Sequence, residues 1–188
     1  STLMRSSAAS DVYKRQASRD LIKENGWAAV SIRAVASRCS VSAGTIYNYY
    51  ESKADLLSDT IESIWHEIFF HPEDEQVFHD VESCISWIYE RLEYGNRQFP
   101  GFFSLHSFGF MRDEKTSGKK RMMKTWGHIL NGLCEVLEND PKVRADVFDQ
   151  EFTEKKFADI LFSLILVSMI RQDYDPSSVL MLVKKTLY

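Results

Sequence analysis

Between Ser42 and Lys53 the chain carries a run of hydroxyl, amide and cationic side chains, the groups that proteins use to bind nucleic acid. Hydroxyl and amide groups can bond phosphate oxygens and base edges, and a lysine can pair with the phosphate backbone. The small residues Ala43 and Gly44 would let the start of a helix approach a duplex closely. The polar members of the run are Ser42, Thr45, Tyr47, Asn48, Tyr49 and Lys53. The pattern predicts a DNA-binding surface, although it also fits the solvated face of a small helical hairpin.

Two short helices separated by a tight turn would position this run. Residues 32–39 have apolar side chains at i, i+3, i+4 and i+7, the spacing of a short amphipathic helix. Ser31 precedes them as a candidate N-cap, because its hydroxyl can accept a hydrogen bond from a free backbone N–H. The hydroxyl groups of Ser40 and Ser42 favour a turn, and a second helix is expected from Thr45 to Tyr50. Two short helices joined in this way form a helix-turn-helix, whose second helix enters the major groove.

A longer helix is expected to follow the helix-turn-helix. Ser52 and Asp55 have the spacing of a capping box, and apolar residues continue at helical spacing to about Phe70. This helix would connect the DNA-reading part of the chain to the remainder and could act as a lever between them.

Residues 41–57, VSAGTIYNYYESKADLL, resemble the signature of the TetR family of bacterial transcriptional repressors, which reads approximately V-S-x-G-T-[LI]-Y-x-[HY]-[FY]-x-[ST]-K-x-x-L-[LI]. Upstream residues match the family's first two helices, so the resemblance covers about residues 17–57. The first helix is expected to run from about Ser10 or Ala17 to Glu24 and to stop at the C-cap pair Asn25-Gly26. It implies an all-α protein with a three-helix helix-turn-helix DNA-binding domain at residues 17–57. A linking helix would join this domain to a larger helical ligand-binding and dimerisation domain at residues 58–188.

The DNA-binding residues expected from this resemblance fall into two groups. Thr45, Tyr47, Tyr49 and Lys53 are assigned mainly to phosphates, and Arg33, Ala43, Gly44 and Asn48 to the vicinity of base edges. An arginine at position 33 suits the O6 and N7 atoms of guanine, although a solvated surface arginine is the alternative. With Ser31 and Ser42 added, the full set is Ser31, Arg33, Ser42, Ala43, Gly44, Thr45, Tyr47, Asn48, Tyr49 and Lys53.

Residues 1–16 are expected to be a non-native or disordered arm without function. The hexapeptide at 11–16, DVYKRQ, can be a translation of GATGTGTATAAGAGACAG, which resembles a transposon end used to prepare sequencing libraries. Our hypothesis is that native sequence resumes near Ala17; the alternative is an ordinary polar N-terminal arm. An intact native gene encoding the hexapeptide would refute the hypothesis.

Composition excludes several classes of protein. Hydrophobic residues make up 44% and aromatic residues 13% of the 188 residues, which excludes a disordered chain. Only 8 glycines and 4 prolines favour helices over a turn-rich β fold. Three widely spaced cysteines without a CxxC pair argue against a disulfide framework and favour a reducing cytoplasm. The longest nearly apolar run, 160–170, is too short to span a bilayer. Neither the motifs nor the spacing of the histidines predict a catalytic centre, a metal site or a cofactor.

The net charge of −4 is unevenly distributed. Residues 1–57 contain eight Lys and Arg against five Asp and Glu, a charge of +3, whereas the remainder carries −7. The positive charge of the helix-turn-helix region would attract DNA, and the negative charge of the remainder would keep DNA from binding elsewhere.

A ligand pocket is expected among the body helices, as the resemblance implies. Proteins bind small molecules in pockets lined by aromatic and aliphatic side chains with a few polar groups. The candidates are Trp87, Phe103, His106, Phe110, Met122 and Trp126. For each of them the alternative is ordinary core packing.

A homodimer is expected because residues 157–170 are apolar nearly all round, and a helix of that kind needs cover on more than one side. The single short helix that follows supplies too little material, and a second copy could complete a two-fold four-helix contact. The expected interface residues are Phe157, Ile160, Leu161, Leu164, Ile165, Ser168, Val179 and Val183. Burial within one monomer is the alternative.

The sequence therefore predicts a cytoplasmic, ligand-responsive transcriptional regulator. It would bind palindromic operator DNA as a homodimer, as a repressor released by a small-molecule effector of unknown identity. One alternative is a co-regulatory module of the same fold that acts through a protein partner. A small helical enzyme using His106 as acid or base is a third, more remote hypothesis.

Overall fold

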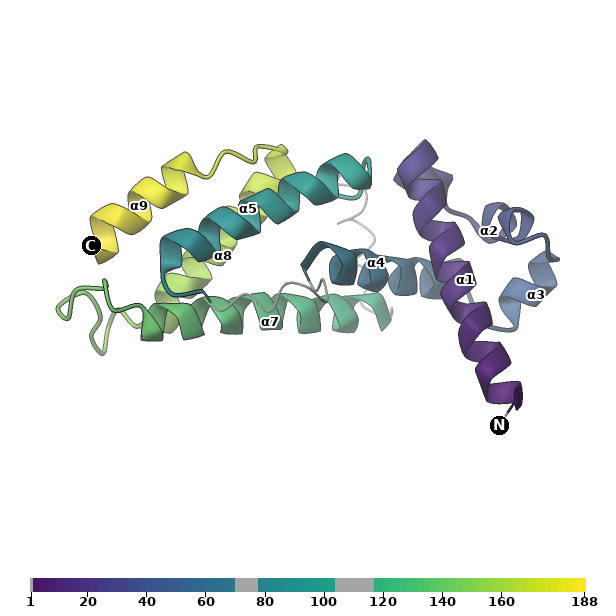
Figure 1. The fold of residues 1–188 in the computed structure, drawn as a ribbon, viewed down its shortest axis with the longest axis horizontal. Coiled ribbons are helices and arrows are strands. Elements are labelled where there is room, and N and C mark those ends of the chain that lie inside the picture. The colour runs from purple at the N-terminus through teal and green to yellow at the C-terminus, as the bar shows by residue number, and fades with distance from the viewer. Residues whose placement is uncertain (1, 70–77, 104–116) are drawn as a thin grey trace. The chain divides into compact units, whose positions relative to one another are not determined.

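The computed structural model describes residues 2–69, 78–103 and 117–188, with side chains from Val12 onward in the first helix and from Trp126 onward in α7. Every regular element in these ranges is helical (Figure 1), which agrees with the predicted all-α fold. No helix in these ranges has the length and apolar character needed to cross a membrane. The elements are α1 (Thr2–Asn25), η1 (Trp27–Ala29), α2 (Ile32–Arg38), α3 (Ala43–Tyr47), α4 (Lys53–Phe69), α5 (Val81–Gln98), α7 (Ser117–Asn139), α8 (Glu154–Arg171) and α9 (Ser177–Leu187).

Helix α1 begins at Thr2, ahead of the predicted start at Ser10 or Ala17. Residues 2–16 are therefore helical in the structure, and their assignment as a non-native or disordered arm stays a hypothesis. The helix ends at Asn25, as predicted, because Gly26 adopts a φ of +77° that favours glycine. The backbone N–H of Gly26 still donates to the carbonyl of Ile22 across 2.8 Å.

Serine caps fix the two short helices. The Ser31 hydroxyl accepts from the N–H of Ala34 across 3.1 Å, and the Ser42 hydroxyl accepts from the N–H of Thr45 across 3.1 Å. Because Ser42 is the cap, α3 begins at Ala43 and not at the predicted Thr45. Helix α2 packs against both α1 and α3, and each of these three helices contributes a fully buried side chain: Ile22, Val35 and Ile46.

Helix α4 begins with the predicted cap, in which the Ser52 hydroxyl accepts from the N–H of Asp55 across 3.2 Å. Its inward face includes Leu56, Ile64 and Ile68, each with no exposed surface.

The chain folds as two compact units with boundaries that differ from the expected division at residue 57. Unit 1 comprises residues 1–69 and 95–123, and unit 2 comprises residues 70–94 and 124–188. Two helices, α5 and α7, contribute residues to both units. Unit 1 thus contains the helix-turn-helix together with the C-terminal end of α5.

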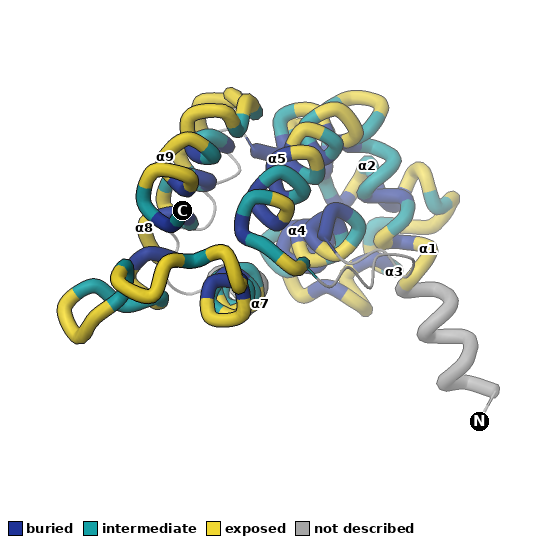
Figure 2. The backbone as a smooth tube through the Cα atoms, turned by 60° about the vertical axis from the view of Figure 1, so that its left-hand side comes forward, coloured by how far each residue is buried: buried dark blue, intermediate teal, exposed yellow. Residues whose placement is uncertain are grey.

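Unit 2 has its own core and a polar tie at one end. Leu133, Leu161 and Val183 from α7, α8 and α9 are almost completely buried. Buried Asp140 accepts hydrogen bonds from the N–H of Val81 and from the hydroxyl of Tyr188, so it holds the start of α5 to the end of α9. Buried and exposed residues alternate along α8 and α9, giving each an inner and an outer face (Figure 2).

Candidate nucleic-acid interface

Helix α3 presents its polar side chains to solvent and its single large apolar residue to the core. Tyr47 and Tyr49 are 54% and 40% exposed, whereas Ile46 is fully buried. Ser42, Gly44 and Asn48 are exposed, and Ala43 and Thr45 are half-buried. The predicted outward presentation of residues 42–49 is therefore present in the structure.

The exposed residues of α3 are held in defined positions. The hydroxyl oxygens of Ser42 and Thr45 lie 3.0 Å apart and share a hydrogen bond. The ammonium group of Lys14 lies 3.0 Å from the centre of the Tyr49 ring, a cation–π contact that restrains this tyrosine. A Cβ placed on Gly44 would meet only the Ser42 hydroxyl, at 3.6 Å, an ordinary contact. Because the fold has room there for a larger residue, Gly44 is not required for packing.

Several cations near the helix-turn-helix are held by acidic residues of unit 1. Arg38 forms a two-pronged pair with Glu24, which lowers the pKa of that carboxyl through the side-chain hydrogen bonds. Arg19 and Lys23 both reach Glu67, at 3.1 and 3.0 Å. These ion pairs join α1 to α2 and α4, and they compete with DNA phosphates for the same cations.

Arg33 and Lys53 differ from those cations. Both are exposed, Arg33 in the first turn of α2 and Lys53 at the first position of α4. Among the ion pairs of the described residues, neither side chain takes part. Ser31 is half-buried, and its hydroxyl oxygen is engaged as the cap of α2. The predicted surface thus has two charged groups available for an anionic partner.

Sequence reasoning missed Asp59, which supports α3 from behind. Its carboxylate accepts from the buried Tyr50 hydroxyl and from Arg15, each across 2.8 Å. Asp59 is only 8% exposed. The sequence did contain one sign that Asp59 has a structural role. It is an acidic residue on the apolar face of the predicted linking helix, three positions after Leu56.

Residues 15–60 match the model of the family described as bacterial regulatory proteins, tetR family. This chain carries a TetR-family DNA-binding domain. Members of the family are regulators of transcription and not enzymes. No protein of curated function matches the sequence.

Solved structures of transcriptional regulators match most of the chain. The regulator FadR from Bacillus subtilis, crystallised with stearoyl-CoA, is 17% identical with a TM-score of 0.65, over 94% of this chain and 99% of FadR. The fatty acid degradation regulator FadR from Bacillus halodurans is 18% identical with a TM-score of 0.54, over 92% and 91% of the two chains. A TetR regulator from Rhodococcus sp. RHA1 is 15% identical with a TM-score of 0.53, over 96% and 94%. These likenesses confirm the TetR-type fold predicted from the sequence.

The predicted ligand-binding residues of this TetR-type fold are divided between the two units. Phe103 is buried in unit 1 beside Trp65, with ring centres 5.6 Å apart. Trp87 and Trp126 are half-buried in unit 2, where they contact Phe78 and Phe162. Three further candidates lie outside the described residues or side chains: His106, Phe110 and Met122. The pocket stays a prediction.

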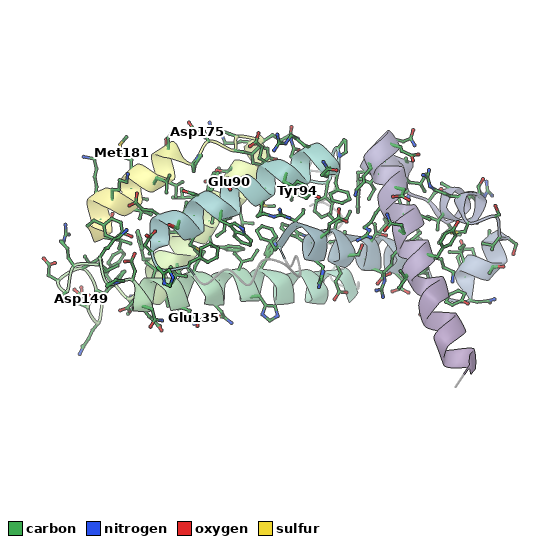
Figure 3. All side chains as sticks on the ribbon, viewed as in Figure 1. Glu90, Tyr94, Glu135, Asp149, Asp175 and Met181 are labelled. Carbon is green, nitrogen blue, oxygen red and sulfur yellow. The ribbon has the colours of Figure 1, made fainter. Side chains whose placement is uncertain are left out.

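The predicted dimer residues occupy both faces of α8 but only the inner face of α9. Five are buried within the single chain: Phe157, Leu161, Ile165, Val179 and Val183. Leu164 and Ser168 are half-buried, and the Ser168 hydroxyl bonds that of Tyr89 across 2.8 Å. Ile160 is exposed, and it shares the outer faces of the two helices with Val167, Ile170, Met181 and Leu182 (Met181 is labelled in Figure 3). We call these five exposed residues the outer apolar face.

Proposed function

We propose that this chain is a cytoplasmic, ligand-responsive transcriptional regulator that represses by binding a palindromic operator as a homodimer. The observation that carries the proposal is the exposed polar surface of α3, flanked by the exposed cations Arg33 and Lys53. In a helix-turn-helix the second helix lies in the major groove, where Asn and Arg side chains can read base edges. Tyr47, Tyr49, Thr45 and Lys53 would hold the phosphates on either side.

The proposed dimer uses the outer apolar face. Its members are 37% to 57% exposed in the single chain and come from two adjoining helices. A contiguous exposed apolar surface marks an interaction site, and we propose that these five residues form such a surface. Two copies related by a two-fold axis would bury this patch and place two α3 helices on half-sites about 34–36 Å apart.

The proposed effector would release DNA by favouring a state in which the two α3 helices are wrongly spaced. A ligand that bound both states equally would shift nothing, so release requires a difference in affinity. The similar regulator from Bacillus subtilis was crystallised with stearoyl-CoA, which makes a long-chain acyl-CoA the first compound to test. If stearoyl-CoA lowers operator affinity and coenzyme A alone does not, the effector class is established.

The deciding experiment is selection of bound sequences from random double-stranded DNA by the purified protein. An inverted repeat is the expected result, and it would supply the operator sequence. Recovery of no preferred sequence would contradict the proposal. It would favour the second candidate, a co-regulatory module acting through a protein partner, especially if a DNA-free complex survived high salt.

A further inference from the structure

The turn that follows α5 is bonded directly to the DNA-binding domain inside unit 1. The backbone N–H of Trp27 donates to the carbonyl oxygen of Pro100 across 3.1 Å. Trp27 is the first residue of η1, where a backbone N–H has no partner within its own helix. The Pro100 carbonyl therefore accepts a hydrogen bond from the Trp27 N–H, which has no other backbone acceptor in the segment between α1 and α2.

The geometry of this turn depends on Gly101. Residues 99–102 form a β-turn closed by a 3.0 Å hydrogen bond from the N–H of Phe102 to the carbonyl of Phe99. Proline in the second position and a φ of +78° at Gly101 in the third identify a type II turn. Types I and II differ by a flip of the central peptide. Only the type II turn therefore directs the Pro100 carbonyl toward Trp27.

Aromatic and cation–π contacts also join this turn to helices α1 and α4 of unit 1. The ring of Phe102 lies edge-on to Trp27 at 5.9 Å and to Trp65 of α4 at 5.7 Å. The ammonium group of Lys23 on α1 lies 4.9 Å from the centre of the Phe99 ring. The turn thus contacts α1, η1 and α4 at once, through side chains that are almost fully buried.

Helix α5 also approaches α4 too closely to slide past it freely. A Cβ built on Gly95 would lie 2.6 Å from the Cδ1 atom of Ile68 and 3.1 Å from the Phe103 ring. Interiors packed to this density transmit displacements rather than absorb them. The C-terminal end of α5 and the DNA-binding domain must therefore move together.

We propose that the turn at residues 99–103, with Gly101 as its positioning residue, sets the orientation of the DNA-binding domain for operator binding. The bond from Trp27 to Pro100 then holds the DNA-binding domain in addition to its covalent link through α4. Residues 95–98 of α5 lie in unit 1 together with the turn and the helix-turn-helix, so the turn acts on the DNA-binding domain within one compact unit. The inference rests on the proposed DNA binding but concerns residues remote in sequence from α3.

The test replaces Gly101 with residues that disfavour its positive φ but whose Cβ atoms fit the space. A Cβ on Gly101 would meet nothing nearer than 3.7 Å, so alanine fits sterically and is opposed only by the positive φ. Asparagine tolerates that conformation better than alanine does. Gly101→Ala is expected to lower affinity for the selected operator about tenfold, and Gly101→Asn by clearly less. Gly132→Ala, in the interior of α7, is the matched control and should leave affinity unchanged.

Three readouts separate positioning from a loss of stability. In Gly101→Ala we expect faster hydrogen exchange at the Trp27 N–H, a changed preference for operators with one base pair added or removed between half-sites, and unchanged affinity for a scrambled duplex. Operator affinity and Trp27 protection equal to those of the wild type would overturn the inference. So would an equal loss of affinity for operator and scrambled DNA. If the wild-type protein itself prefers no DNA sequence, it is the proposed function that fails.

Discussion

The hydroxyl of Tyr50 donates a hydrogen bond to the carboxylate of Asp59 across 2.8 Å, in the buried space between α3 and α4. Arg15 reaches the same carboxylate oxygen from α1. One acidic side chain on α4 thus ties Tyr50, shortly after the end of α3, to α4 itself and to α1. The position of α3 depends on this bond as well as on its serine cap.

Removing the Tyr50 hydroxyl tests that dependence. Tyr50→Phe keeps the ring but removes a donor to a buried carboxylate, so we expect a loss of about 1–3 kcal/mol in the free energy of unfolding. For a chain of this size each kcal/mol corresponds to a fall of roughly 2–4 °C in melting temperature. Tyr47→Phe, at an exposed ring, is the control and should leave the melting temperature unchanged. Equal melting of the two variants would show that the Tyr50 bond contributes nothing.

Arg33 and Lys53 should affect DNA binding differently although both are exposed cations. Lys53→Ala removes a phosphate contact, so it should weaken binding to every sequence and reduce the slope of log K against log salt by about 1. Arg33→Ala should cost about 1–3 kcal/mol on the selected operator and relax the preference at one base pair, with less effect on scrambled DNA. Titrations at several salt concentrations measure both effects. A Lys53→Ala protein with unchanged affinity for nonspecific DNA would show that its assignment is wrong.

Local signals allowed much of the DNA-binding surface to be predicted. The caps at Ser31 and Ser52 were predicted because each bonds a backbone N–H three residues away, whereas Ser42 was assigned to the turn and its role as the cap of α3 was missed. The bonds from Tyr50 to Asp59 and from Trp27 to Pro100 were not, because they join residues that only the folded chain brings together. Periodicity cannot supply contacts of that kind.

The second half of the chain shows the same limit. Residues 157–170 were correctly predicted to be helical, but a helix with apolar residues nearly all round does not reveal which side faces its own core. The structure places Phe157, Leu161 and Ile165 inward and Ile160 outward. That choice depends on where α5, α7 and α9 lie, which the pattern of a single helix does not contain. The start of α1 was also missed, since a polar segment gives no apolar stripe to follow.

The outer apolar face gives a direct test of the proposed dimer. Val167 is 47% exposed and lies between Ile160 and Ile170 on α8. A charge buried at a dimer contact without a partner is strongly unfavourable, so Val167→Asp is expected to convert the dimer to a monomer of 21.8 kDa. Asn131→Asp adds the same charge at an exposed position of α7 and should remain dimeric. Sedimentation or light scattering measures the mass, and a dimeric Val167→Asp protein would place the interface elsewhere.

One substitution, glycine to alanine, should have opposite effects at two helical positions. At Gly95 the new Cβ would lie 2.6 Å from Ile68, and overpacking of this kind costs about 1–3 kcal/mol. At Gly132 no described atom lies within 4 Å of the new Cβ, so the higher helix propensity of alanine should stabilise the protein by up to about 1 kcal/mol. The melting temperature should fall in Gly95→Ala and rise in Gly132→Ala, relative to the wild type. A stabilised Gly95→Ala protein would mean that α4 and α5 can separate easily.

The ion pair between Asp80 and Lys142 predicts a dependence of stability on acid. Lys142 donates to Asp80 across 2.9 Å and the N–H of Ser83 donates across 2.8 Å, which together lower the pKa of Asp80 to about 2. A carboxyl in an unfolded chain has a pKa near 3.9, roughly two units higher. Because the pKa is lower in the folded state, the stabilisation is complete above about pH 4 and disappears as the pH falls toward 2.

Asp80→Asn should therefore lower the melting temperature at pH 7 and make progressively less difference between pH 4 and pH 2. Lys142→Gln, which removes the donor instead of the carboxylate, should show the same trend. The exposed loop residue Asp146 supplies the control, since Asp146→Asn should change stability little at any pH. Thermal melts of the wild type and the three variants across this range measure the effect. If the loss in Asp80→Asn were equally large at pH 7 and pH 2, it would arise from packing rather than from the ionised carboxylate.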